Sequence, residues 1–75
     1  MKEILIGRMY RHYKNKDYII IDIAQHSETL EKLVVYKALY GENLTWVRPY
    51  DMFIENVEYN GEVTERFKLV NDKDI

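Results

Sequence analysis

A chain of 75 residues forms one small domain, and a domain of this size buries only roughly 60% of the surface that its unfolded chain exposes. The absence of cysteine excludes disulfide bonds and cysteine-ligated zinc sites, so packing or self-association must stabilise the fold. The net charge of −2 argues against a strongly basic nucleic-acid-binding protein.

The first residues and the hydropathy pattern indicate a cytoplasmic protein. The stretch Met1–Ile6 is too short and too quickly charged for a secretory signal peptide. An apolar run such as Tyr18–Ile21 is far shorter than the ~20 residues of a membrane-spanning helix. We therefore expect a soluble cytoplasmic protein that does not contact a membrane.

The charges are distributed unevenly along the chain. Residues 1–16 carry five basic side chains and one acidic one, whereas residues 50–75 carry seven acids and three bases. The simplest interpretation is that strands from the two ends lie side by side and neutralise each other. Nucleic acid is therefore not the favoured partner, and any such binding should be weak and salt-dependent. The basic residues that would contact phosphate are Arg8, Arg11, Lys14 and Lys16.

The first part of the chain predicts a hairpin of two strands. Residues 8–13 alternate large and charged side chains, and Tyr18–Ile23 is rich in β-branched and aromatic residues. The polar turn 14–17 joins them. His12 shares a strand face with Tyr10, so we expect a half-buried, hydrogen-bonded histidine there.

A polar turn, His26–Thr29, follows this hairpin. Ser27 or Thr29 could cap a single helical turn, with Glu28 near its positive N-terminal end, or the turn could contact a ligand. A hydrolytic triad is disfavoured, because neighbours in sequence rarely align as nucleophile, base and orienter. The spacing of the two histidines matches no zinc template, and we expect neither a metal nor a cofactor.

The middle of the chain predicts two more strands and a helical turn. Residues 33–40 form the third predicted strand, in which Lys37 lies on the opposite face from Tyr36 and points to solvent or a partner. Gly41 begins a tight return into a fourth strand at residues 44–48. Pro49 ends that strand because it cannot donate a ladder hydrogen bond, and residues 50–53 form one helical turn. The residues predicted to share one face of the third strand are Val34, Tyr36, Ala38 and Tyr40.

The pair Asn60-Gly61 predicts a type I′ hairpin turn, because both central residues of that turn take positive φ. Counting outward from this turn gives the register of the last two predicted strands. Residues 71–75 are expected to form a frayed tail. The predicted cross-strand neighbours are Tyr59 with Glu62, Val57 with Thr64, and Glu55 with Arg66 on one face, and Ile54 with Phe67 on the other.

Five blocks of the sequence carry a family resemblance. They are Gly7-x-x-Tyr10-x-His12-Tyr13-Lys14, His26-Ser27-Glu28-Thr29, Val34-Val35-Tyr36-x-x-Leu39-Tyr40-Gly41, Trp46-Val47-Arg48-Pro49 and Met52-Phe53. Together they resemble the small bacterial family called domain of unknown function 1653 (DUF1653). The resemblance implies a small SH3-like β-barrel and implies no activity. Together with the predicted strands, it leads us to expect an all-β, SH3-like barrel of five or six strands with at most one or two helical turns. Asn15 stands where that family has a glycine.

Seven tyrosines and one tryptophan indicate a recognition surface or a tyrosine-rich core. Exposed rings could stack on bases or hold a proline-rich peptide, while Arg48 binds a phosphate or carboxylate. In a small barrel, however, tyrosine rings also fill the core, and we assign Tyr36 and Phe53 to it. Arg48 could equally form a salt bridge with Glu28 or Asp51.

The predicted ligand-binding site lies where the fourth strand returns along the third toward the turn at residues 26–29. We expect its side chains to line one partly exposed concavity. The five residues of this predicted site are His26, Glu28, Tyr40, Trp46 and Arg48.

The sequence supports three functional interpretations. The first is a non-enzymatic binding module that recognises a peptide, a nucleic acid or a small polar ligand through the predicted site. The second is a small enzyme or enzyme regulator in which His26 and Glu28 transfer protons. The third is a self-associating structural protein, a homodimer for example, because the third predicted strand is apolar on both faces around Lys37.

Overall fold

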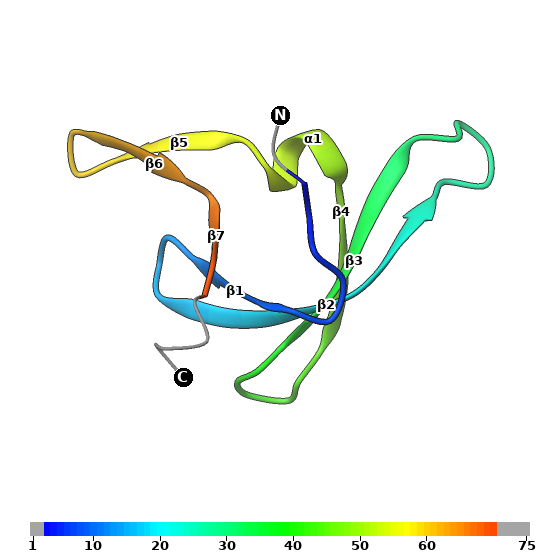
Figure 1. The fold of residues 1–75 in the computed structure, drawn as a ribbon, viewed down its shortest axis with the longest axis horizontal. Helices are drawn as coiled ribbons and strands as arrows, with labels where there is room; N and C mark the ends of the chain where they lie inside the picture. Colours follow the sequence, from blue (N-terminus) through cyan, green and yellow to red (C-terminus); the bar gives the residue numbers. More distant parts are fainter. Residues whose placement is uncertain (1–2, 71–75) are drawn as a thin grey trace.

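Short strands make up most of the computed structural model, which describes residues 3–70 (Figure 1). One helical turn, α1 (Tyr50–Phe53), follows β4 as predicted. The all-β fold class is confirmed, and the predicted tail at residues 71–75 lies outside the described residues. No helix within residues 3–70 is long and apolar enough to cross a membrane. The strands are β1 (Met9–His12), β2 (Lys16–Gln25), β3 (Lys32–Ala38), β4 (Thr45–Pro49), β5 (Asn56–Tyr59), β6 (Glu62–Glu65) and β7 (Phe67–Leu69).

The strands form two antiparallel sheets. The larger sheet has the order β4-β3-β2-β1-β7, and the hairpin β5–β6 forms the smaller one. Figure 1 shows the β2–β3 and β5–β6 hairpins extending to opposite sides of the molecule, with α1 between them. The strand pairs within residues 3–70 do not close the larger sheet into a ring. The strands number seven rather than five or six because the chain bends at Arg66 and divides the last predicted strand into β6 and β7.

The two ends of the chain lie side by side, as predicted, because β1 pairs with both β2 and β7. Their charges do not neutralise each other along this pairing, since Arg11 lies opposite Lys68. Arg11 instead donates to the carboxylate of Asp17, with its Nε 2.7 Å from the nearer oxygen. Arg11 therefore has an acidic partner within the first hairpin.

The tight turns have the backbone conformations that their residues favour. Asn60 and Gly61 have φ of 54° and 79°, the signs that a type I′ turn requires. Asn15 has φ of 67°, in the left-handed region that asparagine tolerates. The first hairpin therefore keeps its turn without glycine.

The register predicted for the β5–β6 hairpin is confirmed where the two strands pair, because Tyr59 lies opposite Glu62 and Val57 opposite Thr64. Beyond the paired residues, the Arg66 N–H donates to the Glu55 carbonyl at 3.0 Å, and the Arg66 guanidinium lies 3.2 Å from the Glu55 carboxylate. Both contacts keep these two residues as cross-strand neighbours.

The predicted strand pair of Ile54 with Phe67 is wrong. The Ile54 N–H donates to the Tyr50 carbonyl at 3.2 Å, which continues the helical turn through this residue, and β5 begins only at Asn56. Ile54 still packs against the core cluster that contains Phe67. Ile54 is therefore part of the apolar core, as expected, but it reaches the core by side-chain packing rather than by strand pairing.

The core lies on the inner face of the larger sheet and consists mainly of aromatic side chains. Tyr36 and Phe53, both predicted core residues, are 4% and 1% exposed. The rings of Phe53 and Phe67 stack 4.0 Å apart, and Tyr10 packs against the edge of Phe53. The buried residues of this cluster are Ile4, Tyr10, Ile20, Val34, Tyr36, Phe53 and Phe67.

The two faces of β3 follow the predicted alternation over most of the strand. Val34, Tyr36 and Ala38 are buried, and Lys37 is exposed. Tyr40, predicted on the same face and in the partly exposed site, is 40% exposed. The reason is that β3 ends at Ala38, so Tyr40 has already left the sheet.

Candidate functional site

The structure separates the five residues of the predicted site into two groups. His26 and Glu28 lie in the loop before β3, whereas Tyr40 follows the other end of the same strand. Seven strand residues span roughly 20 Å at the usual rise per residue, so these groups cannot surround one small ligand. The prediction of a single concavity is therefore wrong for His26 and Glu28. Trp46 and Arg48 lie between the two ends, opposite Tyr36 and Val34 of β3.

His26 shapes its loop through its imidazole. Its Nδ1 accepts hydrogen bonds from the backbone N–H groups of Glu28 at 3.1 Å and Thr29 at 3.3 Å. The Leu30 N–H donates to the His26 carbonyl at 2.9 Å, so the expected single helical turn is present, but Ser27 and Thr29 do not cap it. Thr29 instead accepts from the Glu31 N–H at 3.2 Å. The histidine thus supplies the acceptor that was expected from a hydroxyl.

Arg48 lies on the inner face of the sheet beside the aromatic core. Its Nε donates to the Tyr36 hydroxyl at 3.2 Å, and its guanidinium carbon lies 5.7 Å from the centre of the Phe67 ring. Within residues 3–70 it forms no ion pair with Glu28 or Asp51. The guanidinium is half-buried and held in place by neutral groups.

Three tyrosines extend this surface from Arg48 toward the end of β3. The Tyr18 ring meets the rings of Tyr36 and Tyr40 edge-on at 5.2 and 5.5 Å, and the Tyr18 and Tyr40 hydroxyls share a hydrogen bond. Trp46 is the cross-strand neighbour of Tyr36 and is 49% exposed. We call the surface formed by Tyr18, Tyr36, Tyr40, Trp46 and Arg48 the Arg48 face.

The electrostatic environment beside the Arg48 face is positive. Burial lowers the pKa of His12, and the positive charges of Arg48, Arg66 and Lys14 lower it further. The same imidazole packs edge-on against the Phe67 ring at 4.9 Å and accepts a hydrogen bond from the Lys14 N–H at 3.1 Å. The half-buried, hydrogen-bonded role predicted for His12 is confirmed.

Burial also affects one tyrosine hydroxyl of this face, that of Tyr18. Burial and the hydrogen bond to Tyr40 raise the pKa of Tyr18, and the nearby charge of Arg48 opposes this shift only in part. The hydroxyl therefore stays protonated at physiological pH and can donate a hydrogen bond. A positive guanidinium next to neutral hydroxyls is suited to an anionic group.

The lowered pKa of His12 leads to a prediction about stability and pH. Between the folded pKa and the unfolded value of 6.5, the unfolded state binds more protons, so the free energy of unfolding rises with pH across this window. Acidification from about pH 8 to about pH 5 should therefore destabilise the protein. Urea unfolding at several pH values tests this, and His12→Gln should weaken the pH dependence. A pH dependence that His12→Gln leaves unchanged would contradict the prediction.

The basic residues near the N-terminus are used in different ways. Arg11 is paired with Asp17, and Arg8 is half-buried beside β1. Lys16 places its Nζ 4.7 Å from the centre of the Tyr40 ring, and Lys14 places its own 5.9 Å from that of Tyr13. Lys16 therefore adds a positive charge at the Tyr40 end of the Arg48 face.

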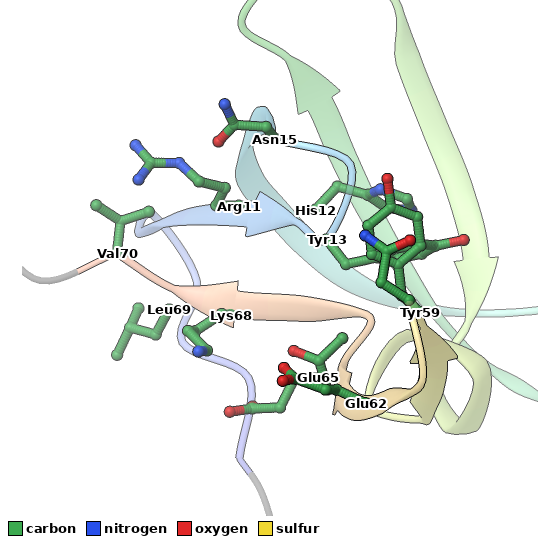
Figure 2. A pocket seen from close by; sticks show the side chains of 12 residues that line it. Arg11, His12, Tyr13, Asn15, Tyr59, Glu62, Glu65, Lys68, Leu69 and Val70 are labelled. Atoms are coloured by element: carbon green, nitrogen blue, oxygen red, sulfur yellow. The ribbon is translucent and has the colours of Figure 1, made fainter.

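A cavity of about 370 Å³ lies beside β7 and was not predicted (Figure 2). Figure 2 shows His12, Tyr13 and Tyr59 together on one side of it, and the two tyrosine rings meet edge-on at 5.2 Å. Lys68 and Glu62 are among its other lining residues. The sequence carried no signal for this cavity, because it depends on a contact between tyrosines from distant hairpins.

The residues of the predicted site do not line the three cavities described for residues 3–70. The Arg48 face is thus not a pocket but a surface around one guanidinium, in which the Trp46 and Tyr40 rings are partly exposed and the Tyr36 ring is buried. Within the same residues, no three carboxylate or imidazole side chains gather in a way that could hold a metal ion.

Comparison with known proteins connects this fold to one family. The family model described as a protein of unknown function, DUF1653, matches residues 8–69. The crystal structure of a DUF1653 protein from Bordetella bronchiseptica is similar, with 31% sequence identity, a TM-score of 0.80, and coverage of 88% of this chain and 87% of that one. No curated protein matches the chain. The family match over most of the length, together with this shared fold, shows that the chain belongs to the DUF1653 family.

Proposed function

We propose that this protein is a non-enzymatic binding module for a ligand that carries a phosphate next to a flat aromatic ring. This is the chemistry of a nucleotide, free or within a single strand. The observation that carries the proposal is the Arg48 guanidinium, which is half-buried, oriented by Tyr36 and not paired with a carboxylate within residues 3–70. A guanidinium held in this way offers fixed donors that match a phosphate bidentately.

The aromatic residues beside Arg48 support a ring-bearing ligand. Trp46 and Tyr40 are 49% and 40% exposed, so each offers part of its ring to solvent. Stacking of a base on such a ring contributes about 1–3 kcal/mol and tolerates any base, because every base has a π face. Lys16 above the Tyr40 ring adds a second positive charge within reach of a backbone phosphate.

The charge of the whole protein limits the strength of this binding. A net charge of −2 gives no long-range attraction to a polyanion, so local contacts at the Arg48 face must supply the affinity. We therefore expect weak binding that falls steeply as salt concentration rises.

The use of His26 supports a binding module over the alternative enzyme. Proton transfer by His26 and Glu28 would need the imidazole to meet its partner and a substrate. Its Nδ1 instead accepts two backbone hydrogen bonds within an exposed loop. Glu28 contributes its N–H rather than its carboxylate to this arrangement.

Fluorescence of Trp46, the single tryptophan, tests the proposal directly. The probes are a mononucleotide, a short single-stranded oligonucleotide, the matching nucleoside and inorganic phosphate. We expect saturable quenching by the nucleotide probes, a much weaker effect of the nucleoside, and loss of quenching at high salt. Tighter binding of the oligonucleotide would identify a single strand as the source of the phosphate. The proposal fails if no nucleotide probe gives saturable quenching up to about 1 mM.

The cavity beside Tyr13 and Tyr59 favours a second candidate function, binding of an extended peptide. Its volume of about 370 Å³ lies within the range of small-ligand sites, and aromatic walls accept proline rings. Lys68 and Glu62 offer one charge of each sign along it. A peptide seated there would shift the NMR resonances of Tyr13 and Tyr59 and leave those of the Arg48 face unchanged.

A further inference from the structure

β4 is an edge strand whose outer side is not paired within residues 3–70. The Ala38 N–H donates to the Leu44 carbonyl at 2.9 Å, just before β4 begins. Hydrogen-bonded pairs alternate along an antiparallel ladder, so Trp46 and Arg48 also direct their backbone groups toward β3. The backbone N–H and C=O groups of Thr45 and Val47 consequently point to the free edge.

The sequence of β4 is complementary to itself in an antiparallel pairing. If Val47 lies opposite Val47 of a second copy, Trp46 lies opposite the partner's Arg48, and Thr45 lies opposite the partner's Pro49. The two valines then form a hydrogen-bonded pair through the backbone groups that are free in one copy. Trp46 and the partner's Arg48 form a non-hydrogen-bonded pair, in which side chains approach more closely, and a guanidinium over an indole is attractive.

We propose that two copies of this chain associate through β4 in this register, forming a two-fold dimer in which the larger sheets join edge to edge. The interface is isologous, because each copy offers the same strand, and it closes at two subunits. The Trp46 ring from one copy then covers the face of the partner's Arg48 that does not meet Phe67, and the terminal N–H groups stay available while Nε donates to Tyr36. Each Arg48 face is thereby completed by a residue from the second copy.

The outer face of the sheet supports this pairing. Val47 is 61% exposed and lies opposite Val35 on β3, so joining two edges would place the two Val47 side chains together and remove apolar surface from water. Val63, in the separate β5–β6 sheet, is even more exposed at 72% but lies away from β4. Exposure of a valine therefore does not by itself identify β4 as the interface. β4 is identified because its edge is unpaired within residues 3–70 and its sequence is complementary to itself.

Pro49 limits how far the pairing can extend. Thr45 can donate to the carbonyl of the partner's Pro49, but proline has no N–H to return. A strand of five residues also forms a smaller interface than the roughly 800 Å² per partner of a standard stable complex. The dimer should therefore be weak, and its population should depend on protein concentration.

Sedimentation velocity over a concentration series tests the dimer with two matched variants. The unmodified protein should shift from monomer to dimer as its concentration approaches about 1 mM. Val47→Lys places like charges directly opposite each other across the two-fold axis and should weaken association at least tenfold. Val63→Lys adds the same charge outside β4 and should associate like the unmodified protein.

Three results would overturn the dimer proposal. The unmodified protein could remain monomeric throughout the series, Val47→Lys could still form the dimer, or Val63→Lys could disrupt it equally. Circular dichroism of both variants checks that the fold is retained. Nucleotide quenching of Trp46 in monomeric Val47→Lys is a separate readout, because Val47 points to the opposite face of the sheet from Arg48.

Discussion

Replacing Arg48 with glutamine should abolish nucleotide binding at the Arg48 face while the protein remains folded. The substitution removes the positive charge and the donors that would contact phosphate. Each charge-assisted hydrogen bond contributes about 1.5–3 kcal/mol, so affinity should fall by roughly tenfold or more for every bond lost. The measurement is a Trp46 fluorescence titration with a mononucleotide, repeated with each variant.

Two further variants determine what Arg48 contributes. Arg48→Lys keeps the charge but loses the planar fork, so it should recover only part of the affinity. Arg11→Gln removes a guanidinium that is already paired with Asp17 and should bind nucleotide almost normally. The pKa of His12 should rise in Arg48→Gln, because one of the charges that lowers it is gone. NMR titration of the imidazole measures this shift.

Stability measurements distinguish a binding role for Arg48 from a structural one. Arg48→Ala loses the hydrogen bond to the Tyr36 hydroxyl, which is worth about 1 kcal/mol. Combined with Trp46→Phe, it should leave the fold largely intact and eliminate ligand binding. A collapse of the unfolding temperature in Arg48→Ala would instead identify Arg48 as a residue that holds the structure together.

Truncating Phe53 to alanine should remove a large part of the stability of the domain. Phe53 is 1% exposed, stacks on Phe67 at 4.0 Å and meets Tyr36 edge-on at 5.4 Å. Such truncations cost about 3–5 kcal/mol, whereas a domain of 75 residues has a total stability of roughly 4–11 kcal/mol. The free energy of unfolding in urea measures the loss.

Two control variants interpret the Phe53 result. Phe53→Leu keeps much of the buried volume and should cost clearly less than Phe53→Ala. Val63→Ala changes a side chain that is 72% exposed and should alter stability by less than about 0.5 kcal/mol. A loss below about 1.5 kcal/mol in Phe53→Ala would contradict the central place of this ring in the core.

Turn preferences and the alternation of side chains along a strand predicted the parts of the fold that depend on residues close together in the sequence. The Asn60-Gly61 turn determined the register of β5 and β6, because its length allows one way of pairing the flanking residues. The alternation in β3 placed Val34 and Tyr36 inside, because the side chains of a strand alternate between faces. These features follow from a few residues at a time.

Turn preferences and side-chain alternation could not predict the irregular features of the fold or the contacts between segments far apart in the sequence. A register shift between Ile20 and Asp22 interrupts the β2–β3 pairing, and no turn residue marks it. The hydrogen bonds that His26 accepts depend on the loop conformation, which the residue types alone did not determine. The meeting of Tyr13 with Tyr59 requires two hairpins to be placed in space.

The predicted site was likewise correct in its strand pairing and wrong in the distances between its residues. The short return after Gly41 correctly placed Trp46 and Arg48 alongside β3, opposite Tyr36 and Val34. The strand was expected to bring them to the loop containing His26, but its length keeps that loop away from Tyr40. The sequence thus predicted that β4 pairs with β3. Which residues come close enough to form one site could be seen only from where the strands begin and end.

NMR of the side-chain N–H groups of Arg48 and Trp46 during a nucleotide titration tests the central claim most directly. Binding at the Arg48 face should shift the Arg48 Nε–H and the Trp46 indole N–H together, with one saturation curve. Shifts confined to Tyr13 and Tyr59, or no saturable shift at either N–H group, would show that the Arg48 face does not bind nucleotides.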